Sequence, residues 1–145
     1  MKNKINILVI STEVKFSDIK VSECKNSFDN KTVNTKTQNG LGHDTIYASA
    51  VGDSTLKVRT TNTLFSCCAS EIRLSAAIDT TTIAVTLSQS EDGAQCNCLC
   101  GRSIEFLLSS LKEGQEYSVS IKKDIFEYYS FDFTFSGGTN LTFNF

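Results

Sequence analysis

Several features are scarce or missing in this sequence of 145 residues, and each absence excludes a class of protein. Positive charge is not in excess: 14 Lys and Arg stand against 16 Asp and Glu, so the composition predicts no basic field that would attract a nucleic-acid backbone. No apolar run reaches the roughly 18 residues that a membrane-spanning helix needs. The P-loop, G-x-G-x-x-G and G-x-S-x-G motifs are also absent, so no common phosphate-binding or hydrolase motif supports an enzyme.

The sequence contains a single histidine, which limits catalysis further. His43 lies between Gly42 and Asp44, so any Ser/His/Asp or Cys/His machinery would depend on this glycine-flanked loop. Loops gather polar residues whatever their role, and an exposed loop histidine explains the pattern as well. We therefore expect no catalytic residue, no cofactor and no enzyme activity.

Hydroxyl-bearing and aromatic side chains are abundant instead. Phe contributes 10 residues and Ser and Thr are frequent, while Pro is absent and Trp is absent. Thr and the aromatic residues suit the pleated surface of a strand. Apolar residues also alternate with polar ones at a period of two, which is typical of strands with one buried side. The alternating stretches are Leu56/Val58, Ile72/Leu74/Ala76/Ile78, Ile83/Val85/Leu87, Ile104/Phe106/Leu108, Tyr117/Val119/Ile121, Phe131/Phe133/Phe135 and Leu141/Phe143/Phe145.

This alternation predicts one all-β domain over residues 1–145, a two-sheet antiparallel β-sandwich of immunoglobulin-like or Greek-key type with about eight or nine strands. We expect hairpins at Asp79-Thr80 and where residues 136–140 separate the last two apolar stretches. The phase of the alternation changes at Ser17-Asp18, which predicts a bulge or a short break. Residues 25–45 are polar and are predicted to form a long loop or a weak edge region.

The six cysteines are one single residue, one adjacent pair and one alternating triple: Cys24, then Cys67 and Cys68, then Cys96, Cys98 and Cys100. On a strand, neighbours in the triple would have Cα atoms ~6.6 Å apart, near the upper limit for a disulfide. Directly opposed residues of two antiparallel strands come closer, at ~4.5 Å. We therefore expect the strand from Leu56 to the adjacent pair to lie beside the strand from the triple to Leu108, so that the two groups meet.

Three interpretations of the cysteines stay open. All six are disulfide candidates, because an even count fits an oxidising compartment, and a bridge between the groups would close a loop of about 30 residues and contribute roughly 3 to 4 kcal/mol. Free thiols acting as small apolar core residues are the second interpretation. The third is a thiolate metal or redox site, although the usual C-x2-C spacing is absent. Its candidate ligands are Cys67, Cys68, Cys96, Cys98 and Cys100.

Short motifs around the cysteines follow a distinctive order. Residues 22–25, 65–68 and 96–100 read S-E-C-K, F-S-C-C and C-N-C-L-C. In this order, over about residues 22–145, the chain resembles lipoprotein-like β-sandwich domains of Bacteroides-type gut bacteria. It departs from that group at Gly101-Arg102-Ser103, where an aromatic residue followed by Asp is usual, and at Ser66, where Asn is usual. The resemblance implies an extracytoplasmic β-sandwich and supplies no catalytic residue.

Three functions follow from these observations. The first is a non-enzymatic binding or structural module of the cell envelope, whose partner is a protein or a glycan held by the loops or by an edge strand such as Leu141–Phe145. The second is the thiolate metal or redox site. The third is a small outer-membrane β-barrel, because the chain ends in alternating apolar residues and a terminal Phe145. We expect an extracytoplasmic location, although residues 1–10 do not read as a signal peptide.

Overall fold

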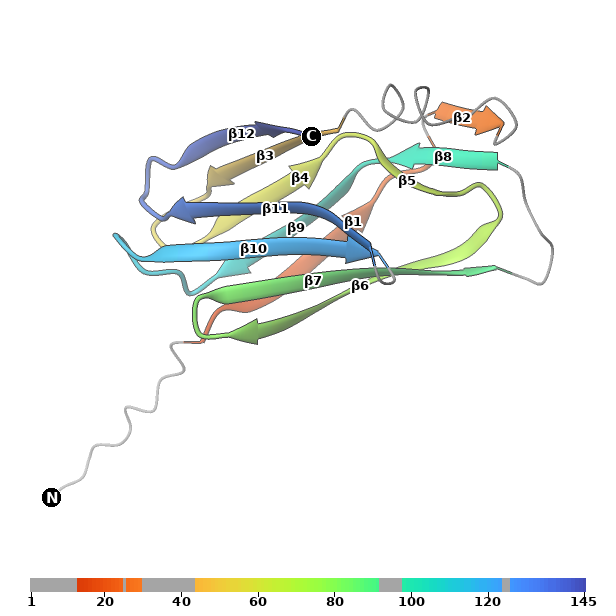
Figure 1. Cartoon of the computed structure of the whole chain (residues 1–145). Coiled ribbons are helices and arrows are strands. Elements are labelled where there is room, and N and C mark those ends of the chain that lie inside the picture. Colours follow the sequence, from red (N-terminus) through yellow and green to blue (C-terminus); the bar gives the residue numbers. More distant parts are fainter. Residues whose placement is uncertain (1–12, 25, 30–43, 92–97, 124–125) are drawn as a thin grey trace, which may run out of the picture.

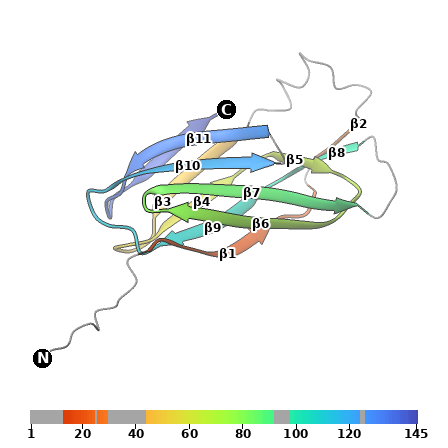
Figure 2. The same ribbon diagram turned by 60° about the horizontal axis from the view of Figure 1, so that its bottom comes forward.

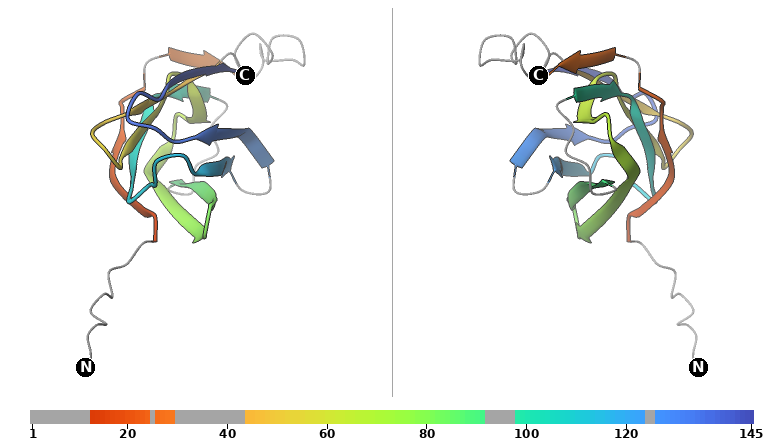
Figure 3. Two further views of the ribbon diagram at one scale, coloured as in Figure 1. Left: turned by 90° about the vertical axis from the view of Figure 1, so that its left-hand side faces the viewer. Right: turned by 90° about the vertical axis from the view of Figure 1, so that its right-hand side faces the viewer.

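β-Strands dominate the computed structural model, which describes residues 13–24, 26–29, 44–91, 98–123 and 126–145. These residues form twelve strands and no helix, which confirms the predicted all-β class. The sheets pack as a sandwich of two layers (Figures 1 and 3). The strands are β1 (Lys15–Val21), β2 (Asn26–Asp29), β3 (Thr45–Ala50), β4 (Leu56–Thr60), β5 (Thr63–Ser66), β6 (Ala69–Asp79), β7 (Thr82–Glu91), β8 (Cys98–Arg102), β9 (Ile104–Ser109), β10 (Glu116–Lys123), β11 (Phe126–Thr134) and β12 (Asn140–Asn144).

The first layer contains a five-stranded antiparallel sheet in the order β1-β9-β4-β3-β12. Its strands alternate as predicted: in β4 and β9 every second side chain is buried and the ones between are half-buried. The pairing of β1 with β9 shifts register between Ser17 and Lys20, where Asp18 has a φ of 52°. This shift confirms the predicted bulge.

A three-stranded sheet in the order β2-β8-β5 extends the first layer. Its order repeats β1-β9-β4, because each of its strands adjoins one of those strands in the chain: β1 leads into β2, β4 into β5 and β8 into β9. All three connections are interrupted at the same level. The interruptions lie just after Val21, Thr60 and Arg102, and we call this line of interruptions the bend. The predicted long strands from Leu56 and to Leu108 are therefore each two strands, which raises the count above the expected eight or nine.

Side-chain hydroxyls form hydrogen bonds across the bend. Ser103 N donates to Ser22 Oγ over 2.8 Å, and Ser103 Oγ donates to Thr60 O over 2.8 Å. Thr60 Oγ1 in turn accepts from Ile104 N over 3.1 Å. These bonds satisfy backbone groups where the ladder is interrupted. A period-two pattern contains no information about such a break, because the hydroxyl residues stand at positions that a continuous strand would also accept.

The second layer is a four-stranded sheet in the order β11-β10-β7-β6, seen in front in Figure 2. β6 and β7 form the predicted hairpin, with Asp79 paired to Thr82 and Thr80 at a φ of 58° in the turn. β10 pairs antiparallel with β11 but parallel with β7. The expectation of a wholly antiparallel sandwich is wrong at this pair, because the chain passes through β8 and β9 in the other layer before it returns.

The last two strands do not form the predicted hairpin. β11 pairs with β10 in the four-stranded sheet and β12 pairs with β3 in the five-stranded sheet, so residues 135–139 cross from one layer to the other. The aromatic rings meet across the core instead: the centroids of Phe131 and Phe143 are 4.7 Å apart. Alternating Phe residues fit a facing layer as well as a neighbouring strand, so the pattern predicted the strands but not their partners.

The described sheets stay open at their sides. β1 and β12 are the edges of the five-stranded sheet, and β6 and β11 are the edges of the four-stranded sheet, so the prediction of a closed barrel is wrong. The described residues also contain no helix with the length and apolar character to cross a bilayer. Of the polar region predicted over 25–45, residues 26–29 form the edge strand β2, and residues 30–43 lie outside the described residues.

The core fills the space between the layers with side chains from the predicted alternating positions. Every one of the larger fully buried residues is aliphatic or aromatic, and Phe65, Phe106 and Phe135 are the largest. Close packing of this kind fixes the outward positions of each strand as firmly as the inward ones, since the two alternate. The outer faces of both layers are therefore defined by the same residues that build the core.

Candidate functional site

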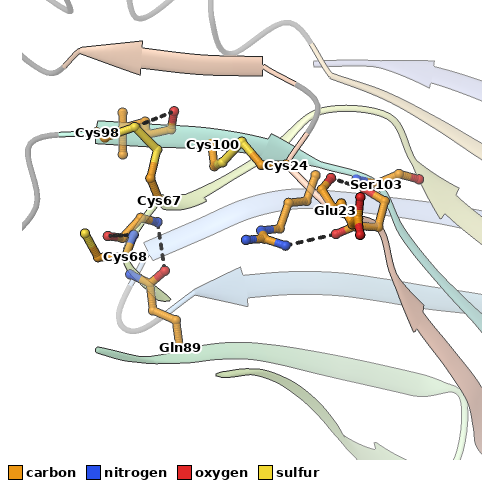
Figure 4. The surroundings of a disulfide bond; sticks show 12 residues. Glu23, Cys24, Cys67, Cys68, Gln89, Cys98, Cys100 and Ser103 are labelled. Atoms are coloured by element: carbon orange, nitrogen blue, oxygen red, sulfur yellow. Dashed lines mark hydrogen bonds between the residues drawn. A yellow bond between two sulfur atoms is a disulfide. The ribbon is translucent and has the colours of Figure 1, made fainter. Parts of the chain in front are cut away.

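Two disulfides hold the three-stranded sheet together (Figure 4). Cys24, which follows β1, is bonded to Cys100 of β8, with Cα atoms 5.4 Å apart. Cys67, which follows β5, is bonded to Cys98 of β8, with Cα atoms 5.3 Å apart. Cys67 N also donates to Cys98 O over 2.9 Å. The bridges thus join the segments on both sides of β8 to this central strand.

The predicted meeting of the two cysteine groups is confirmed. β5 runs antiparallel to β8, and the Cys67–Cys98 bridge spans a sequence separation of 31 residues. Cys68 is also disulfide-bonded, and no cysteine among the described residues is a free thiol, so the free-thiol interpretation is wrong for them. Cys96 lies outside the described residues.

The sulfur atoms of different bridges lie close to one another. The Sγ atoms of Cys24, Cys67 and Cys100 are all within 4.8 Å of each other. Tetrahedral zinc would hold thiolate sulfurs ~3.8 Å apart, so the cluster has the right scale for a metal site. In the oxidised protein these sulfurs are bonded in pairs and are not thiolates. Sequence reasoning did not include Cys24 among the ligands, because a lone cysteine 76 residues before its partner has no spacing signal.

A buried carboxylate, Asp44, accepts hydrogen bonds from the turn between β4 and β5, which is part of the bend. Asp44 is 2% exposed and directly precedes β3. Its Oδ1 accepts from Thr61 N over 2.8 Å, from Thr61 Oγ1 over 3.0 Å and from Asn62 N over 2.8 Å. Its Oδ2 accepts from Thr63 Oγ1 over 3.0 Å and from the hydroxyl of Tyr129. One side chain therefore connects β3, the turn between β4 and β5, and β11 in the opposite layer.

Two further sequence predictions concern His43 and the last strand, β12. His43 lies outside the described residues. β12 lies at the edge of its sheet and pairs only with β3 among the described strands, so it is an edge strand, as the hypothesis of edge pairing requires. β12 is short, however, and short edge strands are one way in which proteins limit pairing with other chains.

The outer face of the five-stranded sheet contains a hollow of about 310 Å³. We call it the outer hollow, and its lining residues are Tyr47 and Ser49 of β3, Lys57 and Arg59 of β4, and Asn140 of β12. The strand register brings them together, because Tyr47 is paired with Arg59 and Ser49 with Lys57. The Arg59 guanidinium carbon lies 4.7 Å from the centroid of the Tyr47 ring. No sequence motif marked these residues, since they are simply the outward positions of three strands.

Comparison with known proteins assigns no role to the cysteine cluster or to the outer hollow. The chain matches no family model, no curated protein and no solved structure.

Proposed function

We propose that the chain is a non-enzymatic, extracytoplasmic binding module whose envelope partner occupies the outer hollow. The hollow is the observation that carries this proposal. Ligand sites in proteins are concave and combine aromatic surface with a few well-placed polar groups. The outer hollow offers a partly exposed aromatic ring, a hydroxyl, an amide and two cationic groups on three neighbouring strands. Strands of a packed sheet hold such groups in fixed positions, so little order is lost when a partner binds.

The extracytoplasmic location is supported by the disulfides. Disulfide bonds form and persist in oxidising compartments and are rare in a reducing cytosol. Two of them in one small sheet, with no free thiol among the described cysteines, fit the location that the resemblance to lipoprotein-like domains implies. That resemblance, and an immunoglobulin-like or Greek-key classification of the sandwich, stay predictions.

Retention of envelope material by the purified, oxidised protein tests the proposal. The immobilised protein is exposed separately to envelope polysaccharide, envelope proteins and lipid vesicles. We expect one fraction to be retained and the retention to be lost in Tyr47→Ala, because this change removes the ring beside Arg59. The matched control is Thr86→Ala, an exposed position on the four-stranded sheet. No retention, or equal retention by both variants, would contradict the proposal.

A second candidate function is a thiolate metal site in the reduced protein, favoured by the three sulfurs within 4.8 Å of each other. A dithiol reductant would convert each bridge to two thiols while forming its own disulfide. Cys24, Cys67, Cys98 and Cys100 could then lose their protons and bind one zinc ion as four thiolates. Zinc analysis of the reduced protein after dialysis tests this candidate. Less than about half an equivalent of zinc, or equal zinc in Cys24→Ser, would rule it out.

A further inference from the structure

The outer face of the five-stranded sheet has a charge opposite to that of the whole chain. The outward positions of its strands contain four cationic residues and one carboxylate: Lys15 and Lys20 of β1, Lys57 and Arg59 of β4, and Glu105 of β9. The face stays cationic when Asp18 in the bulge is counted as well. The chain as a whole has a formal net charge of -2. Among the described residues, this face therefore carries a net positive charge.

The four-stranded sheet shows the contrast. The described outward side chains of its strands are mostly small and polar, and its acidic residues outnumber its basic ones. The charged ones are Glu71, Arg73, Asp79, Glu116, Lys122 and Asp132. A cationic face on a net acidic protein attracts anionic partners to that side and orients them before contact.

Within the cationic face, the outer hollow holds two cationic groups, and Arg59 stands opposite Glu105 in the register of β4 and β9. No carboxylate among the described residues lies within 4.0 Å of Lys57 or Arg59, whereas Glu105 pairs with Lys20 at 3.7 Å. Tyr47 lies beneath the Arg59 guanidinium and restricts it to one region of the hollow. An arginine held in this way loses less conformational entropy when it binds a carboxylate or sulfate group through paired N–H donors.

The remaining lining groups indicate what else the ligand must contain. Ser49 and Asn140 provide a hydroxyl and an amide, which both donate and accept hydrogen bonds. Tyr47 adds a ring that is 38% exposed. A simple inorganic anion would use neither the ring nor the amide. A membrane surface would need a larger apolar area than the exposed Tyr47 and Ile19 and the half-buried Leu107 provide. A ring-shaped, hydroxyl-rich ligand with a negative charge uses all of these groups.

We infer that the outer hollow binds an acidic oligosaccharide, whose carboxylate or sulfate group contacts Arg59 and Lys57 and whose sugar ring contacts Tyr47, Ser49 and Asn140. This inference rests on the proposed function and gives its partner a chemical class. The volume of about 310 Å³ is at the lower end of the range of ligand sites, so the hollow holds one or two sugar units of a longer chain. The rest of the oligosaccharide lies along the sheet beside the remaining lysines.

The test is calorimetric titration of the oxidised protein with oligogalacturonide, with its methyl ester, with a sulfated oligosaccharide and with a neutral glucan of the same length. Vesicles of phosphatidylglycerol and phosphatidylcholine are a separate arm. We expect the acidic oligosaccharides to bind at least about tenfold more tightly than the ester or the glucan. Arg59→Gln should weaken this binding about tenfold or more, because it removes the positive charge and the paired guanidinium donors while it keeps a polar side chain. Preference for carboxylate over sulfate, or the reverse, identifies the acidic group.

The matched control is Arg73→Gln, which removes one positive charge from the four-stranded sheet and should leave the affinity unchanged. Equal loss in both variants would show that overall charge, and not the outer hollow, determines binding, and would overturn the inference. Binding of the ester or the glucan as tightly as the acid would overturn the acidic class but leave the proposed function standing, provided that Tyr47→Ala abolishes it. Binding to the vesicles alone would replace the oligosaccharide with a membrane surface. Binding to none of the probes would refute the inference, and the envelope fractions would then decide the proposed function.

Discussion

Replacing Asp44 with alanine should destabilise the fold more than the loss of any other polar side chain that the structure describes. The carboxylate is buried and accepts five hydrogen bonds from Thr61, Asn62, Thr63 and Tyr129. Two of the donors are backbone N–H groups, which have no freedom to turn toward another acceptor. The three hydroxyl donors can rotate, and Thr63 already has a second partner in Thr60 Oγ1 at 2.7 Å.

The magnitude follows from the donors that are left without an acceptor. A buried donor left unsatisfied costs about 1 to 3 kcal/mol, and the two backbone N–H groups and the buried Tyr129 hydroxyl are the ones at risk in Asp44→Ala. Water that enters the space left by the side chain recovers part of this cost. We therefore expect a loss of about 3 to 4 kcal/mol in the free energy of unfolding. Asp44→Asn keeps the Oδ1 acceptor for the backbone donors and should cost about half as much.

Urea unfolding monitored by circular dichroism measures these differences from the shift in the midpoint at constant m-value. The control is Asp132→Ala, an exposed carboxylate that accepts one bond from Ser118 Oγ over 2.7 Å, and it should change stability by less than about 0.5 kcal/mol. A loss below about 1 kcal/mol in Asp44→Ala, or equal losses in Asp44→Ala and Asp132→Ala, would refute the reasoning that this carboxylate holds the two layers and the bend together.

Three further results are expected. Gly101→Ala should cost about 1 to 3 kcal/mol in urea unfolding, because its Cβ would collide with the Oδ1 of Asn62 and lie 3.1 Å from its Cγ, so that the amide must move. Gly138→Ala has open space and should be neutral; equal effects would contradict the close approach. The double change Cys67→Ser and Cys98→Ser should lower the free energy of unfolding by roughly 3 to 4 kcal/mol, which is the chain-entropy value for a loop of this length. A loss under about 1 kcal/mol would show that the bridge does not restrict the unfolded chain. Mass spectrometry of the non-reduced digest should find both described bridges, and alkylation of the native protein should leave Cys68 unmodified; a bridge from Cys24 to Cys67 would contradict the pairing.

The interiors of the strands could be predicted from the sequence, and so could the proximity of the cysteines. Alternation depends only on one face being buried, and Ile104, Phe106 and Leu108 of β9 satisfy it in any sandwich. The meeting of Cys67 and Cys98 followed because antiparallel neighbours bring distant segments within disulfide range. Both predictions rest on local geometry that does not depend on the order of the strands.

The rest could not be predicted, because it depends on partners that a period-two pattern does not specify. The crossing of residues 135–139 between layers, the parallel pair of β7 and β10, and the bend after Thr60 all leave the alternation unchanged. Asp44 stands in a polar stretch, where a single carboxylate looks like a loop residue until its five donors are seen. The outer hollow could not be predicted for a related reason. Tyr47 and Arg59 come together only through the register of β3 and β4, which the sequence pattern does not specify.

The bend also determines how the molecule is able to open. Because three adjacent strands are interrupted at one level, few ladder bonds connect the three-stranded sheet to the sheet beyond it. Such a region can detach as a cooperative unit, with faster amide exchange in β5 and β8 than in β4 and β9. The bridges lie within this unit and keep its segments together, whereas the outer hollow lies on the far side of the bend. A change of redox conditions should therefore loosen the three-stranded sheet while the outer hollow keeps its shape.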